Sequence, residues 1–563
     1  MREIVAKLPH ILWSVAAVLT FWSFGYTPLA AGDLWWHLAS GRLIVQTRTI
    51  QLVDPWSFTR SSTPWLHHEW LSDVVYYAWE TAFGMAALVY WKWITIVAAF
   101  VILMEVCRRL SKEFVFAYIS VVFSLAVAAP FLDIRPHLYS ILGYSIILLV
   151  ALREDSPIPS WLAGVFLLWV NMHGGFFFGL MALAVIIGCS LYWRKNVKAY
   201  LLCVFACLGN PNGIHAFFYP LRYAFDQSSP FALAIGEWAS PFSPGGISSP
   251  LYPYAIAIFI FSVCYLIYRR AYRNRVASMA IALGTLTLAM SLTSRRFIPL
   301  FAMSEALTLS LVLFQLLGRI VERAPRIVLP SIALGFALLL IWPYPKSISA
   351  FQYLTAEDQF PVEVCNFIEA NNIIGNTFAY YNWGGYLHLR TGGGMKVFID
   401  GRADTVYDDR TLLLYNAVQG FKEGWQQVID SSETNFILWP RDRRGSPMAE
   451  LVQSGRWRPL YDDAVSVLLV RYDRAPSERL KPTLDSGYKR LALGVKQFEL
   501  QEYDSAEEET KRAVTMLPGS NYACRLLAEI YKKNRKADQA FTQDQRCKKC
   551  FPTSVKPWTV FLP

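Results

Sequence analysis

The sequence predicts a polytopic α-helical membrane protein of about eleven spans, followed by an extracytoplasmic α/β domain and C-terminal helical repeats. Hydrophobic residues make up 54% of the 563 residues and charged residues only 17%, which is less charge than soluble proteins carry. The apolar residues form blocks of roughly 18–22 residues, long enough to cross a hydrocarbon core as helices. After about residue 345, the composition changes to strand-like runs and Gly-rich turns, as in a soluble domain.

The apolar blocks give the positions of the predicted spans. Two of them, 159–172 and 199–209, are short for a complete crossing. The full set lies at 11–30, 86–106, 114–131, 138–152, 159–172, 175–193, 199–209, 251–268, 277–293, 297–317 and 327–343.

The formal net charge of +11 reports topology. Its basic residues gather in alternate loops between apolar blocks, as the positive-inside rule requires of cytoplasmic loops. We therefore expect an integral protein of the plasma (inner) membrane, with a cytoplasmic N-terminus and everything after residue 344 extracytoplasmic, and we expect no nucleic-acid partner. The basic segments are Arg108–Lys112, Arg194–Lys198, Arg269–Arg275 and Arg319–Arg326.

Three domains follow from these shifts in composition. A membrane module is expected over 1–345, and an α/β or α+β domain over 346–477, with strand-like runs at 396–399 and 465–470. Residues 478–563 contain a 34-residue period that resembles tetratricopeptide repeats, whose concave face binds partner proteins. The first copy contains Leu493, Gly494, Tyr503, Ala506, Ala513 and Pro518, and the second contains Leu527, Ala528, Tyr531, Ala540 and Pro552.

The sequence leaves two alternatives for the cysteines of the outer region. Cys524 and Cys547 are expected to form a disulfide across the two helices of the second repeat, or to remain free thiols. Cys547 and Cys550 form a CxxC pair, but no second pair accompanies it to complete a metal site.

The first outer loop, about 31–84, carries most of the ionisable residues near a predicted membrane boundary. Asp33 directly follows the first span, with His37 one helical turn later, and His68–Glu69 lie further along between tryptophans. An interfacial loop explains the tryptophans, but polar groups at this depth are costly and indicate a functional site.

Other outer loop ends repeat this pattern, and we expect these side chains to line one cavity with Asp33 and Glu69. Scattered packing histidines would not sort to one side of the membrane. The residues concerned are Asp133, Arg135, His137, Asn171, His173, Asn210, Glu237, Arg295 and Arg296.

The opening Gly-Asp-Leu-Trp-Trp-His-Leu (32–38) and the later His-Glu-Trp (68–70), with the predicted topology, resemble the glycosyltransferase C superfamily. This family contains protein mannosyltransferases, aminoarabinose transferases and oligosaccharyltransferases. The resemblance covers about residues 1–345 and implies a membrane glycosyltransferase. Its partners would be membrane lipids, a polyprenyl-phosphate-linked sugar as donor, and a protein or glycan as acceptor.

The resemblance also implies roles for residues. Asp33 is the candidate general base, with Glu69 next, and His37 and His68 belong to the same catalytic group. A second group would hold the phosphate of the donor, for which arginine is well suited: Arg295, Arg296, Arg135, His137, Asn171 and His173.

Metal use is left open by the sequence. Asp33, Asp133 and Glu237 occupy loops like those that supply carboxylates to the divalent cation (Mg²⁺ or Mn²⁺) of oligosaccharyltransferases. The second outer loop, however, reads Asp133-Ile-Arg135 where that family has Asp-x-Asp. An arginine in place of a carboxylate weakens a hard-cation site, so the sequence favours a reaction without metal.

Two motifs of the soluble domain, Tyr381–Tyr386 and Phe398–Asp404, suit tight turns at strand ends, or an edge that contacts the acceptor. Two other functions remain as alternatives: a membrane transporter with broken spans, and a non-catalytic assembly scaffold built on the repeats. The identities of the donor sugar and the acceptor are not encoded in these patterns.

Overall fold

The structure, a computed structural model, describes residues 2–25, 32–151, 157–190, 192–225, 229–245, 247–341, 360–441, 448–463, 465–474, 485–518 and 520–547. These residues form two compact units. The bundle unit contains the described residues up to 25 and from 88 to 341. The α/β unit contains those from 32 to 87 and from 360 to 547, so the first loop belongs with the C-terminal half of the chain. The predicted domain boundaries, near 345 and 477, lie outside the described residues.

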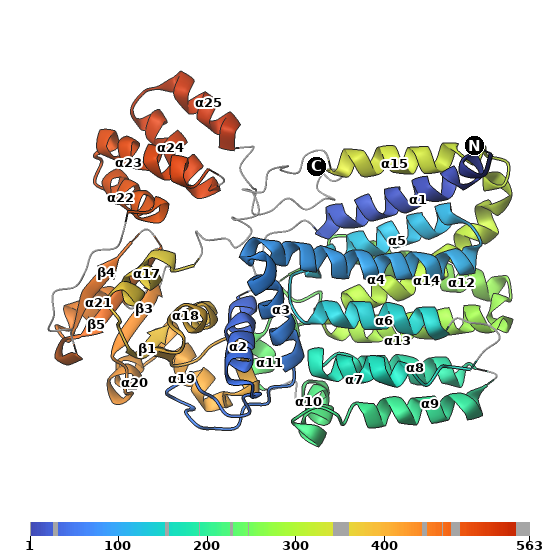
Figure 1. Cartoon of the computed structure of the whole chain (residues 1–563), viewed down its shortest axis with the longest axis horizontal. Coiled ribbons are helices and arrows are strands. Elements are labelled where there is room, and N and C mark those ends of the chain that lie inside the picture. Colours follow the sequence, from blue (N-terminus) through green and yellow to red (C-terminus); the bar gives the residue numbers. More distant parts are fainter. Residues whose placement is uncertain are drawn as a thin grey trace. The chain divides into compact units, whose positions relative to one another are not determined.

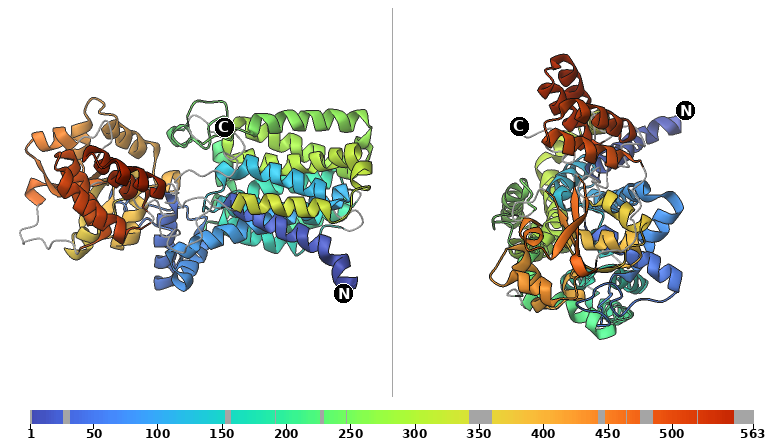
Figure 2. Two further views of the ribbon diagram at one scale, coloured as in Figure 1. Left: turned by 90° about the horizontal axis from the view of Figure 1, so that it is seen from above. Right: turned by 90° about the vertical axis from the view of Figure 1, so that its left-hand side faces the viewer.

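The long helices of the bundle unit run side by side, as Figure 1 and the left view of Figure 2 show, and the short α10 lies across them. The helices α1 and α15 pack on each other, as do α4 on α6 and α5 on α14. Their bounds are α1 Arg2–Gly25, α4 Leu88–Ser111, α5 Phe114–Ala128, α6 His137–Ala151, α7 Leu162–Met172, α8 Phe176–Gly188, α9 Trp193–Ala206, α10 Gly213–Phe225, α11 Pro230–Ala234, α12 Tyr252–Tyr268, α13 Arg275–Thr293, α14 Ile298–Val321 and α15 Val328–Ile341.

Each predicted span overlaps one of these helices; α10 and α11 lie between the seventh and eighth spans. Within the described part of the chain, four helical segments are long and apolar enough to cross a membrane. The chain is therefore an integral membrane protein, and the number of eleven spans stays a prediction. The four segments are Leu88–Ser111, Phe114–Phe131, Arg275–Thr293 and Arg295–Val321.

Small residues let the helices approach closely. A Cβ at Gly143 of α6 would lie 2.7 Å from the ring of Trp169, and one at Gly179 of α8 would lie 2.6 Å from the same ring. Trp169 of α7 is therefore packed between two glycine faces. Close approach through small residues is the usual way in which membrane helices gain packing energy.

The α/β unit is built on a mixed five-stranded sheet in the order β2-β1-β3-β5-β4. The strand β1 is parallel to β2 and β3, whereas β5 is antiparallel to β3 and β4. Strands therefore lie at both strand-like runs of the sequence, near 396 and 466. The strands are β1 Gly375–Ala379, β2 Met395–Val397, β3 Phe436–Pro440, β4 Trp457–Asp462 and β5 Ser466–Arg471; the helices are α17 Val362–Ala370, α18 Gly384–Thr391, α19 Asp409–Gln419, α20 Trp425–Ser431 and α21 Met448–Gln453.

The first loop is an integral part of this unit. It contributes α2 (Asp33–Thr47) and α3 (Trp70–Phe83), which pack on each other, and α2 also packs on α18. Between the two helices, Ser57 bridges to Val397 at the edge of β2, and the backbone N–H of Leu66 donates to the carbonyl of Thr405. A loop of this length is thus held by the sheet.

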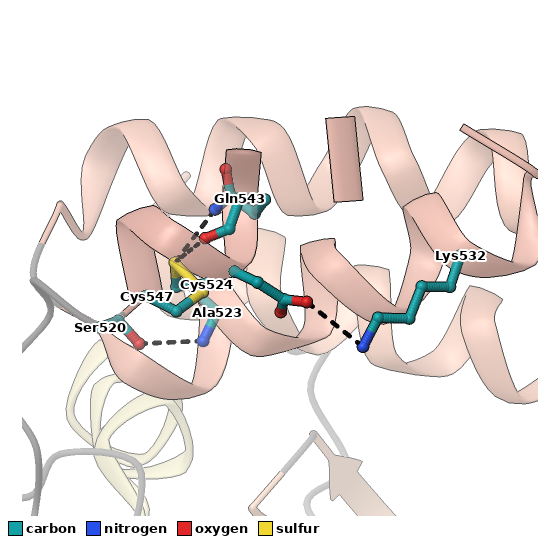
Figure 3. The surroundings of a disulfide bond; sticks show 7 residues. Ser520, Ala523, Cys524, Lys532, Gln543 and Cys547 are labelled. Carbon is teal, nitrogen blue, oxygen red and sulfur yellow. Dashed lines mark hydrogen bonds and ion pairs between the residues drawn. A yellow bond between two sulfur atoms is a disulfide. The ribbon is translucent and has the colours of Figure 1, made fainter. Parts of the chain in front are cut away.

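The C-terminal helices form two hairpins with the predicted period. The helix α24 (Asn521–Lys533) begins 34 residues after α22 (Gly487–Glu499), and α25 (Ala537–Cys547) begins 34 residues after α23 (Tyr503–Met516). A disulfide joins Cys524 of α24 to Cys547 of α25, with Cα atoms 5.6 Å apart (Figure 3). This confirms the first of the two readings of these cysteines, while Cys550 lies outside the described residues.

Candidate functional site

The predicted catalytic residues of the first loop gather around α2 and α3. Asp33 is the first residue of α2, where the helix dipole favours a negative charge, and His37 follows one turn later. Glu69 directly precedes α3 and approaches both histidines: its Oε2 lies 4.0 Å from His37 Nε2, and its Oε1 lies 3.5 Å from His68 Nε2. We call His37, His67, His68, Glu69 and Asp73 the histidine cluster.

The centre of this cluster is Asp73, a residue that sequence reasoning missed. Its Oδ1 lies 2.6 Å from His37 Nδ1, and its Oδ2 lies 2.7 Å from His67 Nε2. Burial alone would raise the pKa of Asp73, but the charges and hydrogen bonds of His37 and His67 outweigh burial and lower it. Because an ionised carboxylate can only accept, Nδ1 of His37 carries a proton toward Asp73, and Nε2 is the ring nitrogen that faces Glu69.

Exposure separates the roles of these groups. His37 is 1% exposed and Asp73 is fully buried, whereas Asp33 and Glu69 are partly exposed. The two carboxylates are therefore accessible from solvent, whereas His37 and Asp73 are buried beneath the surface.

Asp33 lies against the two turn motifs of the soluble domain. A Cβ at Gly401 would lie 2.8 Å from Asp33 Oδ1, and a Cβ at Gly32 would lie 3.4 Å from the carbonyl oxygen of Asn382. The motifs Phe398–Asp404 and Tyr381–Tyr386 therefore flank the candidate base and its neighbour Gly32. This proximity is compatible with both readings of the motifs, as turns and as an edge next to the site.

A buried ionic network fixes the Gly401 turn. The guanidinium of Arg402 donates to Asp400 at 2.8 Å and to Asp54 of the first loop at 2.6 Å, and all three side chains are fully buried. Burial would raise the pKa of Asp400, but Arg402 and the hydrogen bond from His388 hold it well below its usual range. Arg402 also lies over the rings of Trp56 and Trp65 at 5.1 and 4.9 Å, so this network joins the first loop to the sheet.

The predicted phosphate-binding residues gather in the bundle unit. Arg135, just before α6, forms an ion pair with Glu237, and Nε2 of His137 at the start of α6 lies 2.5 Å from the carbonyl oxygen of Phe131. Burial would raise the pKa of Glu237, but the charges of Arg135 and Arg296 lower it to about 2. Glu237 is thus ionised and shared between two arginines.

Arg296 and His173 belong to the same group. Arg296 Nη2 lies 3.3 Å from His173 Nε2, its guanidinium lies 4.9 Å from the ring centroid of Trp238, and its backbone N–H donates to the carbonyl of Glu237. His173 in turn is held by Ser140, whose Oγ lies 2.6 Å from Nδ1. We call Arg135, His137, His173, Glu237 and Arg296 the arginine cluster.

Two residues predicted for the same role have other contacts. Arg295 is 1% exposed, and its guanidinium donates to the carbonyls of Ser240, Ser243 and Gly245, so it holds the loop after α11 in place. Asn171 donates to the carbonyl of Gly209 at 3.2 Å and thereby ties the end of α7 to the turn after α9.

The residues implied as metal ligands lie in both units: Asp33 in the α/β unit, Asp133 and Glu237 in the bundle unit. Glu237 is engaged by Arg135, and Asp133 has an electrostatic interaction with the buried Lys92 of α4. Among the described residues, no group of three or more His, Cys, Asp or Glu side chains is arranged to hold a metal ion. The arrangement of cations around Glu237 fits a divalent metal poorly.

Sequence reasoning grouped residues by loop and therefore missed partners that lie within helices. Asp73 follows Glu69 by four residues, about one helical turn, which places the two carboxylates on the same side at the start of α3, and this spacing was a usable signal. Lys92 had only the weaker signal of a basic residue within an apolar span. The proposal of one cavity for Asp33, Glu69, Asp133, His173 and Arg295 concerns both units and stays a prediction.

No protein-family model and no curated protein sequence matches the chain. The apo crystal structure of the oligosaccharyltransferase of Archaeoglobus fulgidus matches with a TM-score of 0.50 at 12% identity, over 77% of this chain and 70% of that one. The archaeal oligosaccharyltransferase AglB of the same organism, in complex with an inhibitory peptide and a dolichol-phosphate, matches with a TM-score of 0.51 at 12% identity, over 95% and 87%.

A third solved structure is ArnT from Cupriavidus metallidurans in the apo state, with a TM-score of 0.46 at 10% identity, over 84% of this chain and all of that one. The two oligosaccharyltransferase structures establish the fold. The chain is an integral membrane protein with a glycosyltransferase C fold, as the sequence resemblance implied. The similarity to the archaeal oligosaccharyltransferase AglB extends over 95% of the chain.

Proposed function

We propose that the chain is a glycosyltransferase that moves a sugar from a polyprenyl-phosphate donor to a protein or glycan acceptor at the non-cytoplasmic face of the membrane. The observation that carries the proposal is Asp33, a partly exposed carboxylate at the N-terminus of α2, flanked by Gly401. Asp33 takes the proton of an acceptor hydroxyl as its oxygen attacks the anomeric carbon of the donor.

The leaving group of this reaction is a polyprenyl phosphate. As the bond between the anomeric carbon and the phosphate oxygen breaks, negative charge grows on the phosphate, and the arginine cluster supplies the matching charge. Arg296 is the best placed, because Glu237 and Trp238 orient it and Arg295 fixes the loop that carries them. Charge-assisted hydrogen bonds to a phosphate are stronger than neutral ones.

Two further observations support this proposal. One solved oligosaccharyltransferase with a similar fold holds a dolichol-phosphate, which is a lipid phosphate, and an inhibitory peptide. The histidine cluster also provides a second carboxylate, Glu69, which lies 4.0 Å from His37, and His37 is in turn held by Asp73.

The decisive experiment is Asp33→Asn in the purified protein. With a polyprenyl-phosphate sugar and candidate acceptors, the variant is expected to bind donor normally but to transfer sugar about 10²–10⁴-fold more slowly, because the amide cannot accept the proton. Asp408→Asn is the matched control: Asp408 caps α19 in the same unit, and asparagine caps equally well. Full activity of Asp33→Asn would refute the assignment, and Glu69→Gln would then be tested as the base.

A donor-binding assay distinguishes the proposed phosphate contact of Arg296 from the proposed base role of Asp33. Arg296→Ala is expected to weaken donor binding roughly 10–100-fold through loss of a charged partner. Arg109→Ala, which removes an exposed arginine paired with Glu105, is the control and should leave binding unchanged. Normal donor binding by Arg296→Ala would remove the arginine cluster from the mechanism.

The proposed reaction does not route any step through a metal, since Arg135 already neutralises Glu237. Transfer measured after chelation, and again after addition of Mg²⁺ or Mn²⁺, tests this point. Activity that disappears with chelator and returns with cation would instead assign Asp33, Asp133 and Glu237 as ligands.

The finer architecture belongs to the same proposal. It has eleven spans, a cytoplasmic N-terminus, a membrane module over 1–345, an extracytoplasmic α/β domain over 346–477, and tetratricopeptide-like repeats over 478–563 whose face binds a partner protein. Cysteine-accessibility labelling should find residues 485–547 outside and Arg269–Arg275 inside the cell. Labelling of the repeats from the cytoplasm would overturn both the topology and the reaction side.

One observation favours the alternative of a transporter. Glu305 of α14 is fully buried, and neither of its carboxylate oxygens has a hydrogen-bond partner among the described residues. Ionisable groups inside membrane helices often mark transport pathways. A transporter predicts substrate flux that Glu305→Gln abolishes and no sugar transfer by the wild type, whereas a glycosyltransferase keeps transfer activity in Glu305→Gln.

A further inference from the structure

A pocket of about 380 Å³ lies between α2 and α18 in the α/β unit. This volume falls in the range of small-ligand sites. Its wall includes Arg42, Gln46, Trp56, His388 and Arg390, and no acidic side chain is among the described residues that line it. Neither the histidine cluster nor the proposed catalytic step uses any of these side chains.

The guanidinium of Arg42 uses only some of its hydrogen-bond donors within the described residues. Its Nη2 donates to the carbonyl oxygens of Leu389 and His388 near the end of α18, which fixes the guanidinium at the pocket. Its Nε–H and the two N–H groups of Nη1 have no hydrogen-bond partner among the described residues. Glu80 is its charged neighbour outside the wall. A fixed arginine with open donors is suited to an oxyanion.

Arg390 is more fully occupied. It donates to Glu369, Asn366 and the hydroxyl of Tyr386, so its guanidinium is held in place in the wall. Most of its charge is compensated by Glu369. Arg390 therefore shapes the pocket, and Arg42 is the main candidate for direct contact with an anion.

The wall also contains a hydrogen-bond acceptor that lacks a donor. His388 Nε2 lies 2.9 Å from the Asp400 carboxylate, so Nε2 carries the proton and Nδ1 presents its lone pair. Nδ1 is buried and has no hydrogen-bond partner among the described residues. A buried acceptor left unpaired is unfavourable, and a hydrogen bond from a hydroxyl in the pocket would relieve this cost. Trp56 stacks on the imidazole of His388 at 4.9 Å and holds the ring in place.

These features select a ligand that carries both a negative charge and hydroxyl groups. Open guanidinium donors fit an oxyanion, the His388 lone pair fits a hydroxyl, and the exposed amide of Gln46 can bind either. We propose that the pocket is a subsite for an anionic sugar, a hexose that bears a carboxylate or a phosphate group. Its role as part of the acceptor rests on the function proposed above, while binding itself does not.

Binding is tested directly with the full-length protein in lipid nanodiscs. Saturation-transfer NMR titrations would use four probes: glucuronate, glucose 6-phosphate, glucose and acetate. At least one anionic sugar is expected to bind with a Kd of about 1 mM or tighter, and glucose and acetate at least about 10-fold more weakly, since each lacks one half of the recognition. Preference for glucuronate or for glucose 6-phosphate then identifies the carboxylate or the phosphate as the natural charge.

Gln46→Glu is the first variant, because Gln46 is exposed and its replacement puts a carboxylate into the wall without disturbing the core. We expect at least about 10-fold weaker binding of the anionic sugar, by like-charge repulsion. Arg42→Gln should weaken binding similarly. Arg60→Gln, which removes a surface arginine of the same unit outside the pocket, should bind as the wild type does.

Three results would overturn the proposal: no binding of either anionic sugar, equal binding of glucose or acetate, or unchanged binding by Gln46→Glu. The variant Asp33→Asn separates this proposal from the proposed function. It should bind the anionic sugar normally, so failure of transfer chemistry and failure of the subsite give different results.

Discussion

The buried network around Arg402 makes a strong prediction about the α/β unit. Arg402 is the partner of Asp400 and Asp54, and the Asp54 contact spans 348 residues of sequence. Arg402→Met keeps most of the aliphatic volume but removes the charge. The buried carboxylates of Asp54 and Asp400 would then lack the guanidinium that pairs with both of them.

The size of the effect follows from that burial. Removal of one partner from a buried ion pair typically destabilises a protein by about 3–5 kcal/mol, because an uncompensated charge remains inside. Here two carboxylates lose their partner, and the cation contacts with Trp56 and Trp65 are lost as well. We therefore expect the upper part of that range, about 4–5 kcal/mol. For a domain of this size, such a loss corresponds to a fall in Tm of about 8–20 °C.

The assay is thermal unfolding of the full-length protein in nanodiscs, with proteolysis of the α/β unit as the measure of unfolding. Arg60→Met is the matched control, since Arg60 pairs with Asp408 at the surface, where the side chains are 31% and 47% exposed. Surface pairs contribute about 0–1 kcal/mol. The triple variant with Asp54→Asn and Asp400→Asn should recover part of the lost stability, because no charge stays buried without a partner.

Equal stability of Arg402→Met and Arg60→Met would refute the reasoning. It would mean that Asp54 and Asp400 are hydrated or protonated in the folded protein. A triple variant less stable than Arg402→Met alone would show that hydrogen-bond geometry, and not uncompensated charge, dominates this site.

Three further predictions concern other parts of the α/β unit. Gly41→Ala should destabilise the pairing of α2 and α3, because a Cβ there would lie 2.1 Å from the carbonyl oxygen of Asp73; proteolysis of the first loop measures this, and resistance equal to the wild type would contradict it. Burial raises the pKa of Asp463 to about 6, so the stability that goes with its protonated form is fully present below about pH 4 and is lost as pH rises through 6. Asp463→Asn should therefore be more stable than the wild type at pH 7.5, by up to about 3 kcal/mol. At pH 4 this difference in stability should disappear. Cys524→Ser should cost the repeat helices about 3 kcal/mol by opening the loop that the disulfide closes, and reduction of the wild type should reproduce this loss in a urea titration.

Local patterns in the sequence determined the secondary structure well. Apolar blocks set the helices of the bundle unit, because a helix that crosses lipid must satisfy its own backbone and present apolar side chains. The 34-residue period placed α24 and α25 correctly relative to α22 and α23, and the spacing of Cys524 and Cys547 allowed their pairing. The alternation of acidic residues, histidines and tryptophans in the first loop also predicted a site that contains His37 and Glu69, and their side chains lie 4.0 Å apart.

Tertiary structure alone decided which groups these residues meet. Asp73 joins His37 and His67 because α3 packs on α2, and Arg402 meets Asp54 because the first loop lies on the edge of β2. The role of Arg295 likewise followed from the loop that folds over it. Periodicity reports which face of an element is apolar. It carries no information about contacts between distant segments, which depend on how those faces pack together.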